Sequence, residues 1–273
     1  MTDELHVICF PFDALGNAGS GAGAALLTDT VYEIVEDTEH ETRPTRADAY
    51  RGRIEVTECT FDTMPRLAAW RETGSKCIRQ SITENRFTLW LGGNHLSVLP
   101  VYESLEANDL VVQFDAHFDL FDLHDTVEEL SHGNFLRHAA SLPKIVNVGH
   151  RDLLIPDEAV RKVYKETVSA AAVSADFTAV AKQLNAKASK AKRVWIDIDV
   201  DVFDPAFAPA VHQRTPFGLL PQQMLNLLDA VWSSDVVGVS ISEFDPGRDV
   251  NDQTLLLLGW LVEWILLRAA ETK

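Results

Sequence analysis

Short apolar segments alternate with longer amphipathic ones through most of this chain, and this alternation limits the folds open to it. The nearly continuous apolar runs predict buried strands at residues 6–10, 87–91, 110–114, 145–148, 193–198 and 236–241. Helical periodicity appears at residues 96–106, 134–140, 170–186, 221–232 and 252–270. Strands that are apolar throughout are buried on both faces, so the sequence predicts a parallel sheet with helices on both sides.

The composition suits one globular domain with a substantial core. Hydrophobic residues form 46% of the 273 residues and charged residues form 24%, which is an ordinary balance for a globular protein. The sequence contains no internal repeat and no long linker of proline, glycine or serine that would separate two domains. We therefore expect a single domain over residues 1–273.

An acidic excess argues against some classes of partner. The chain has 24 lysine and arginine residues against 41 aspartate and glutamate residues, which gives a formal net charge of −17. Such a field repels nucleic acids and anionic membranes, and it steers cations toward the protein. Solubility alone would explain the charge equally well, but the same field favours a cationic substrate.

Cysteine usage and the apolar segments predict a cytoplasmic protein. The 3 cysteines give neither a disulfide framework nor a CxxC motif. Residues 1–11 do not resemble a signal peptide. The apolar segment 254–267 is interrupted by Glu263 and is too short to span a bilayer.

Two acidic clusters follow predicted strands. Their members are Asp115, His117 and Asp119 after the strand at 110–114, and Asp197, Asp199 and Asp201 at the end of the strand at 193–198. Residues two apart in an extended segment project to one side, so each cluster can converge on one point. Crowded carboxylates cannot all stay ionised unless a cation neutralises them. A lone Asp-x-Asp pair is usually a loop or a cap, but two such clusters, one with a histidine, predict a metal site.

Three further motifs carry polar residues at comparable places. They are Gly92-Gly93-Asn94-His95, Ser131-His132-Gly133 and Ser242-Glu243-Phe244-Asp245-Pro246. Taken alone, a Gly-Gly pair marks only a tight turn, and a single histidine is more often structural. In parallel sheets, however, ligands bind beyond the carboxyl ends of the strands. The motifs that follow strands are therefore expected to meet at one site.

In this order, the motifs GGNH, DAHFD, SHG, DIDVDVFDP and EFDP resemble those of the ureohydrolase superfamily, which contains the arginases and agmatinases. Members of that family carry GGDH, DAHxD, HG, DxDxxDP and ExxP. The resemblance spans residues 90–267. It implies a single α/β domain of three layers, α/β/α, around a mostly parallel sheet of about eight strands. It also implies a pair of manganese ions at the carboxyl edge of that sheet.

The resemblance further assigns the site residues. It implies that one metal is held by His95, Asp115, Asp119 and Asp199, and the other by Asp115, His117, Asp199 and Asp201. Oxygen donors with two imidazoles suit Mn²⁺. Two metals that share a water lower its pKa, and that water would attack the guanidinium carbon and release urea. The expected catalytic residues are His132 as proton shuttle, Glu243 as the partner of the guanidinium, and the shared Asp115.

Some positions depart from the family pattern. Asn94 stands where the family has aspartate beside the metal histidine, and Leu96 replaces a small polar residue. If that aspartate supports a metal ligand, we expect one metal to bind less tightly, because such partners commonly matter by about 10–100-fold.

Other departures concern the substrate end far from the guanidinium. Arginases place small polar groups after DAHxD to hold the α-carboxylate of free arginine, whereas this chain has Phe121 and Glu128 there. Leu154 replaces an aspartate that helps to grip the α-ammonium. Unpaired polar groups discriminate strongly between substrates, so free arginine is disfavoured. The expected substrate-binding residues are Phe121, Glu128, His132, Leu154 and Glu243.

These losses favour an arginine side chain within a peptide, as in the peptide arginases that convert arginine to ornithine in ribosomally made peptides. A small guanidino compound such as agmatine is the main alternative, and a divergent arginase in which Phe121 and Leu154 merely pack also stays open. Other classes are a deacetylase-like enzyme, a formimino hydrolase, and a non-catalytic metal-dependent binding protein. A deacetylase-like enzyme would lack the GGxH histidine, and a non-catalytic binding protein would have lost His132 or Glu243. The sequence leaves a homo-oligomer open.

Overall fold

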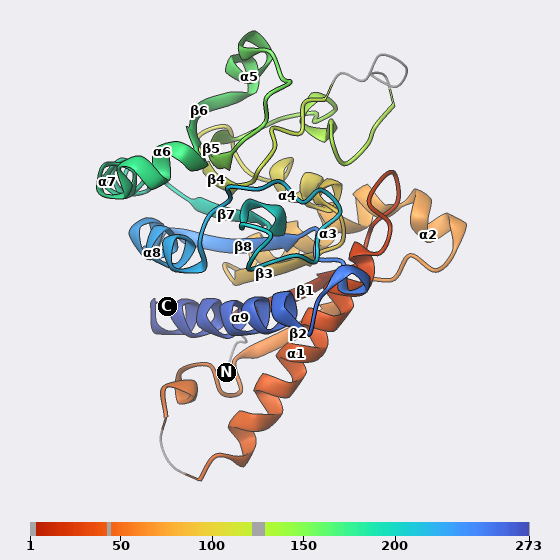
Figure 1. Cartoon of the computed structure of the whole chain (residues 1–273). Helices are drawn as coiled ribbons and strands as arrows, with labels where there is room; N and C mark the ends of the chain where they lie inside the picture. Colours follow the sequence, from red (N-terminus) through yellow and green to blue (C-terminus); the bar gives the residue numbers. More distant parts are fainter. Residues whose placement is uncertain (1–3, 43–44, 122–128, 273) are drawn as a thin grey trace.

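Eight parallel strands form one sheet in the computed structural model, which describes residues 4–42, 45–121 and 129–272 (Figure 1). The strands are β1 (Leu5–Phe10), β2 (Ile54–Glu58), β3 (Phe87–Gly92), β4 (Leu110–Phe114), β5 (Lys144–His150), β6 (Tyr164–Ser169), β7 (Val194–Asp199) and β8 (Val236–Ser242). Their order is β2-β1-β3-β8-β7-β4-β5-β6, and the neighbours pair in parallel. The parallel sheet and its predicted strands are confirmed.

The two strands that the sequence did not predict, β2 and β6, are the edges of the sheet. Their sequences, IEVTE and YKETVS, mix charged and apolar residues and are only partly buried. An edge strand pairs on one side only and stays accessible to water, so it does not need the continuous apolar run that marks the central strands.

The helices differ more from the prediction than the strands do. They are α1 (Ser20–His40), α2 (Met64–Ala68), α3 (Trp70–Thr83), α4 (Leu99–Tyr102), α5 (Asp157–Val163), α6 (Ala170–Ala175), α7 (Phe177–Ala188), α8 (Pro221–Val231) and α9 (Gln253–Thr272). The predictions for α8 and α9 are confirmed. The two long helices α1 and α3 were not predicted.

Three predicted helices are shorter or broken. In place of the helix predicted at 96–106, the chain forms a 3₁₀ turn, His95–Val98, followed by the short α4. In place of the helix predicted at 134–140, it forms the 3₁₀ turn Phe135–Arg137. The predicted helix at 170–186 divides into α6 and α7 at Asp176, whose side chain accepts a hydrogen bond from Ala179 N at 3.0 Å. Aspartate bonds well to the free amides at a helix start, which favours a new helix there.

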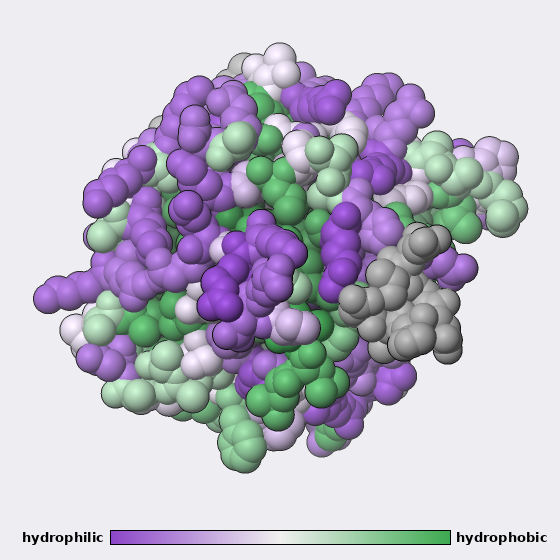
Figure 2. Space-filling view, turned by 90° about the horizontal axis from the view of Figure 1, so that it is seen from above, coloured by the Kyte–Doolittle hydropathy of each residue, from purple (hydrophilic) through white to green (hydrophobic). Residues whose placement is uncertain are grey.

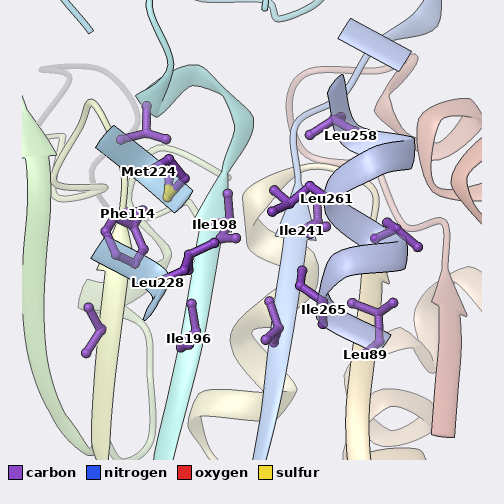
Figure 3. Packing of buried hydrophobic residues seen from close by; sticks show 14 of the residues in the cluster. Leu89, Phe114, Ile196, Ile198, Met224, Leu228, Ile241, Leu258, Leu261 and Ile265 are labelled. Atoms are coloured by element: carbon purple, nitrogen blue, oxygen red, sulfur yellow. The ribbon is translucent and has the colours of Figure 1, made fainter. Parts of the chain in front are cut away.

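Buried apolar side chains lie on both faces of the sheet, as alternation along each strand requires. On one face, Leu258, Leu261 and Ile265 of α9 pack near Leu89 and Ile241 of the sheet (Figure 3). Met224 and Leu228 of α8 pack on that face over β4 and β7 (Figure 3). A second cluster contains residues of α3, α4 and the opposite side of the strands. The three-layer architecture is therefore confirmed.

Helix α9 is long and apolar enough, by length and composition, to cross a membrane. With 20 residues it is longer than the predicted apolar segment 254–267. One side of the helix is buried against the sheet, and Glu263 accepts a hydrogen bond from Tyr50 Oη at 2.9 Å. These contacts are those of a core helix.

Apolar side chains also reach the surface. Leu153, Leu154 and Phe217 are 93%, 81% and 84% exposed. The face seen from above in Figure 2 shows green apolar groups between the purple hydrophilic ones. Leu153, Leu154 and Phe217 lie in loops after β5 and β7, at the edge of the sheet where ligands bind in folds of this class.

The packing of α9 leads to a stability prediction. Leu258 is fully buried, whereas Leu256 on the same helix is 70% exposed. We expect Leu258→Ala to lower the free energy of unfolding by about 2–5 kcal/mol, because the change leaves a cavity in the core. Leu256→Ala is the matched control and should change it by less than about 0.5 kcal/mol. Urea denaturation monitored by tryptophan fluorescence measures both, and equal losses would contradict this assignment of the core.

Candidate metal centre and substrate pocket

Strand register brings the predicted site residues to one edge of the sheet. In the β4–β7 pair Phe114 lies opposite Ile198, so the next residues, Asp115 and Asp199, are neighbours. Asp199 in turn lies opposite Ser242 of β8, which precedes Glu243. His95 begins the turn after β3, the other neighbour of β8. Four adjacent strands thus deliver residues that are up to 148 positions apart in the chain.

The first group of potential metal ligands surrounds Nδ1 of His95. This atom lies 2.6 Å from Asp119 Oδ2, 3.3 Å from Asp115 Oδ2 and 3.3 Å from Asp199 Oδ2. His95 is fully buried, and the three carboxylates are at most 7% exposed. Asp119 has a left-handed backbone with φ of 47°. The four residues are those that the resemblance assigned to one metal, and the structure brings them together.

The second group surrounds Nδ1 of His117. Asp201 Oδ2 lies 2.8 Å from this nitrogen, and Asp115 Oδ1 lies 3.8 Å from it. Asp115 therefore presents one carboxylate oxygen to each group, which is the arrangement of a shared ligand. His95, Asp115 and Asp119, and likewise Asp115, His117 and Asp201, are close enough for one cation each. Asp199 points Oδ2 toward the first group, while its Oδ1 accepts a hydrogen bond from Asp201 N at 2.9 Å.

Burial and crowding shift the pKa values of these residues in the metal-free protein. Burial raises the pKa of Asp115, and the charge of Asp119 raises it further. Burial and the charge of Asp201 raise the pKa of Asp199 well above its usual range. Burial alone would lower the pKa of His117, but the nearby Asp201 carboxylate raises it to about 10. Without a cation, the cluster therefore retains protons that ionised ligands would have to lose.

Several buried polar atoms at this cluster have no hydrogen-bond partner. They include His95 Nδ1, Asp115 Oδ2 and Asp119 Oδ2. Buried polar groups nearly always have a hydrogen-bond partner, so a set of unpaired nitrogen and oxygen atoms directed at one point needs an explanation. A divalent cation between them would supply the missing partner, and the oxygen and imidazole donors suit a hard ion such as Mn²⁺. The residues of the centre thus fit a metal pair.

Asp197 supports His95 from the side away from the cluster. His95 Nε2 lies 2.8 Å from Asp197 Oδ2, which also accepts a hydrogen bond from Tyr102 Oη at 2.7 Å. Ser240 Oγ donates to the other oxygen of Asp197. A carboxylate that accepts from Nε2 leaves Nδ1 to act as a ligand, which is the usual support for a metal-binding histidine. In the sequence Asp197 flanks the ligand pair, which suggests a supporting or turn residue, and the structure places it behind His95.

Above the cluster lies a narrow pocket that contains His132 and Glu243. It is lined by Asn17, His117, Asp119, Phe121, His132, Gly133, Asp199, Asp201, Gln213 and Glu243. His132 Nδ1 lies 3.4 Å from Glu243 Oε1. Burial lowers the pKa of His132, but its contact with Glu243 outweighs burial and leaves the pKa raised. Two lining residues, Asn17 and Gln213, were not predicted from the sequence.

The predicted specificity residues occupy different places. Phe121 lines the pocket, and its backbone N–H donates to Gly133 O at 2.9 Å. Leu154 is exposed and is not among the lining residues. Glu128 lies outside the described residues.

The side chain of Asn94 is directed at backbone carbonyls, since its Nδ2 donates to Ala14 O at 3.1 Å and Gly16 O at 2.6 Å.

This geometry agrees with the comparisons with known proteins. A model of the arginase family matches residues 3–267. The chain belongs to the arginase family. It is 33% identical over 179 residues to the mitochondrial arginase of Medicago truncatula, which covers 60% of this chain and 50% of that protein. The chain thus matches about half the length of that family member.

Other members of the family carry different names. An agmatinase from Halalkalibacterium halodurans is 27% identical over 199 residues, or 66% of each chain. The crystal structure of proclavaminate amidino hydrolase from Streptomyces clavuligerus superposes with a TM-score of 0.81 at 22% identity, covering 100% of this chain and 93% of that one. This last likeness supports the fold. Membership of the arginase family therefore leaves the substrate to be argued from the pocket.

The raised pKa values of Asp115, Asp199 and His117 predict proton release on metal binding. Groups with raised pKa values hold protons at pH 7, and metal ligation requires their deprotonated forms. We expect a divalent cation such as Mn²⁺ to release more than one proton per chain. Titration calorimetry in PIPES and in Tris, which differ in ionisation enthalpy, measures this number. Equal binding enthalpies in the two buffers would contradict the prediction.

Proposed function

We propose that this chain is a manganese-dependent hydrolase that releases urea from a guanidinium group, and that its substrate is an arginine residue within a peptide. The observation that carries the proposal is the buried Glu243 carboxylate, which faces a pocket whose floor is formed by the two groups of aspartate and histidine. A carboxylate in this position fits a planar cation.

In this proposal His95, Asp115, Asp119 and Asp199 hold one Mn²⁺, and Asp115, His117, Asp199 and Asp201 hold the other. The metal pair, when bound, supplies an activated water at neutral pH. Support comes from the two sets of converging donors and from the oxygen of Asp115 that faces each set. Asp197 would fix the ring orientation of His95 through its bond to Nε2.

Glu243 would bind and orient the guanidinium. Its carboxylate is held by the backbone N–H of His95, which donates to Oε1 at 2.8 Å. Its own backbone N–H donates to Gly93 O at 2.8 Å, and its φ is 70°. A left-handed glutamate costs free energy and persists where surrounding contacts require it. These contacts hold the carboxylate at a fixed angle over the cluster.

His132 would protonate the amine that leaves. Its ring lines the pocket next to Glu243 and is partly exposed, with 19% of the side chain accessible. The raised pKa keeps the ring protonated to a higher pH than an isolated histidine, so a proton is available near neutrality. Because the ring reaches solvent, the proton can be replaced between turnovers.

The lining of the pocket supports peptidyl arginine over free arginine. Among the described residues that line it, none is a lysine or arginine that could pair with an α-carboxylate, and four are acidic. A peptide bond replaces the α-carboxylate by a neutral amide, which removes the unfavourable charge contact. The net charge of −17 would also draw a basic peptide to the protein.

Exposed apolar residues close to the pocket would contact such a peptide. Leu15 is 51% exposed, and its carbonyl accepts a hydrogen bond from His132 N at 3.2 Å. Arg151 Nη2 donates to Asp201 O at 2.7 Å and to Thr215 O at 2.8 Å, which ties the loop bearing Phe217 to the end of β7. Exposed apolar groups around a binding site commonly mark a surface for a larger ligand.

A small guanidino compound is the second candidate. The agmatinase relative matches a larger share of its own length, 66%, than the plant arginase does, and agmatine has no α-carboxylate. The acidic lining would accept its free ammonium group. The two candidates therefore share the guanidinium end and differ in the groups beyond it.

The roles of His132 and Asp115 are separable by mutation. We expect His132→Asn to lower kcat by about 10²–10⁴-fold, since it removes the proton donor, while the manganese content stays at the wild-type value. Asp115→Ala should abolish turnover and lose metal, because both groups share this residue. Plasma emission spectrometry measures the metal. Wild-type manganese content in Asp115→Ala would show that the carboxylate is not a shared ligand.

The substrate is decided by a panel of three compounds assayed with Mn²⁺. Urea release is measured from free arginine, from agmatine and from a short arginine peptide with blocked ends. We expect urea from the peptide and a mass loss of about 42 Da per arginine, which is the difference between arginine and ornithine after hydrolysis. Urea from agmatine alone would establish the second candidate. No urea from any of the three, with manganese bound, would overturn the proposed function.

A further inference from the structure

Asn17 connects the two polar residues that face the substrate. Its Nδ2 donates to Glu243 Oε2 at 2.7 Å and lies 3.2 Å from His132 Nδ1. Asn17 belongs to the β1–α1 loop, residues 11–19, and has a left-handed backbone with φ of 40°. One amide group therefore touches both the residue proposed to bind the guanidinium and the residue proposed to protonate the amine.

The bond from Asn17 leaves room for a guanidinium on Glu243. Each carboxylate oxygen can accept about two hydrogen bonds. Oε1 already accepts from His95 N and lies 3.4 Å from His132 Nδ1, whereas Oε2 accepts from Asn17 Nδ2 and keeps a site for a further donor. The fixed bonds prevent the carboxylate from rotating, and the remaining site on Oε2 can accept from a guanidinium.

Asn94 holds the loop that carries Asn17. Its Nδ2 donates to the carbonyls of Ala14 and Gly16, and its backbone N–H donates to Phe12 O at 3.1 Å. Asn94 is fully buried. An aspartate has the same shape but only acceptor atoms, so it would place an oxygen against two carbonyl oxygens. These bonds to the loop explain why asparagine stands at position 94, where the family motif GGDH has aspartate.

The loop also fits closely against His132. Gly16 has φ of 136°, and a Cβ atom at this position would lie 2.0 Å from His132 Cδ2. Only glycine allows both this backbone conformation and this approach. The loop therefore sets the position of the imidazole ring by direct contact.

From these contacts we infer that Asn17 is a positioning residue for the reaction, and that Asn94 is the anchor that delivers it. Asn17 orients the Glu243 carboxylate toward the guanidinium, and the same loop packs against the His132 ring at Gly16. Asn94 acts on the β1–α1 loop and not on the binding of a metal. The inference rests on the proposed function, because it assigns Asn17 to the same pocket and the same substrate group.

The test compares Asn17→Ala, Asn94→Asp and a control, Asn185→Asp. Asn185 Nδ2 also donates to a backbone carbonyl, Ala230 O at 2.8 Å, but joins α7 to α8 far from the pocket. We expect kcat/KM for the urea-releasing substrate to fall at least about tenfold in the first two variants and to stay within twofold in the control. Manganese content should match the wild type in all three.

Hydrogen exchange of residues 11–19, followed by mass spectrometry, separates the two roles. Exchange should become at least about tenfold faster in Asn94→Asp, which loses the anchor, because amide protection reports local opening. It should rise less in Asn17→Ala, which loses the contacts to Glu243 and His132 and the preference of asparagine for a left-handed backbone, than in Asn94→Asp. Loss of manganese in Asn94→Asp with unchanged loop exchange would overturn the inference, as would wild-type kcat/KM in Asn17→Ala.

An inactive wild type would count against the proposed function and would be distinguishable from failure of this inference. In that case the dissociation constant of the blocked arginine peptide, measured by calorimetry on the manganese-loaded protein, replaces kcat/KM. The same ranking of variants is expected, with weaker binding in Asn17→Ala and Asn94→Asp than in Asn185→Asp. Equal affinities in all variants would overturn the role of Asn17.

Discussion

The mutual repulsion of buried carboxylates at the ends of β4 and β7 is the constraint on which the site depends. Parallel register places Asp115 next to Asp199, and the turns that follow add Asp119 and Asp201. Carboxylates at such short distances cannot all remain ionised unless a cation neutralises them. The two histidines carry part of the compensation in the metal-free state, and His117 forms a close pair with Asp201. The sheet forces these residues together, and their combined charge favours a bound cation.

Asp197 shows how the same residue type behaves when its charge is satisfied by protein donors. Asp197 is fully buried and precedes Asp199 by two residues in β7. Its carboxylate bonds to Tyr102, Ser240 and His95. Trp195 Nε1 donates to Ser240 at 3.0 Å and extends the network along the same face of the sheet. Asp197 and Asp199 also share this face of β7, but Asp197 lies inside the strand among protein donors, whereas Asp199 ends the strand at the site.

Most of the fold, and the convergence of the aspartate and histidine side chains at one edge of the sheet, could be predicted from the sequence for a common reason. A central parallel strand is marked by a continuous apolar run, and its carboxyl end is marked by the first polar residues after that run. The spacing of Asp115, His117 and Asp119 is therefore a local signal of a shared direction. The edge strands β2 and β6 lack the apolar run, and α1 begins in a glycine-rich segment that hides its helical pattern.

The features that escaped prediction depend on contacts between distant parts of the chain. Asn17 and Glu243 are 226 positions apart, and no local pattern pairs them. The glycines at 16 and 19, both with positive φ, were a partial signal, since such glycines indicate a backbone that must approach another group. Asn94 was interpreted through its neighbour His95, although its side chain points to the β1–α1 loop. A residue next to a potential ligand in the sequence can face away from it in space, as Asn94 does beside His95.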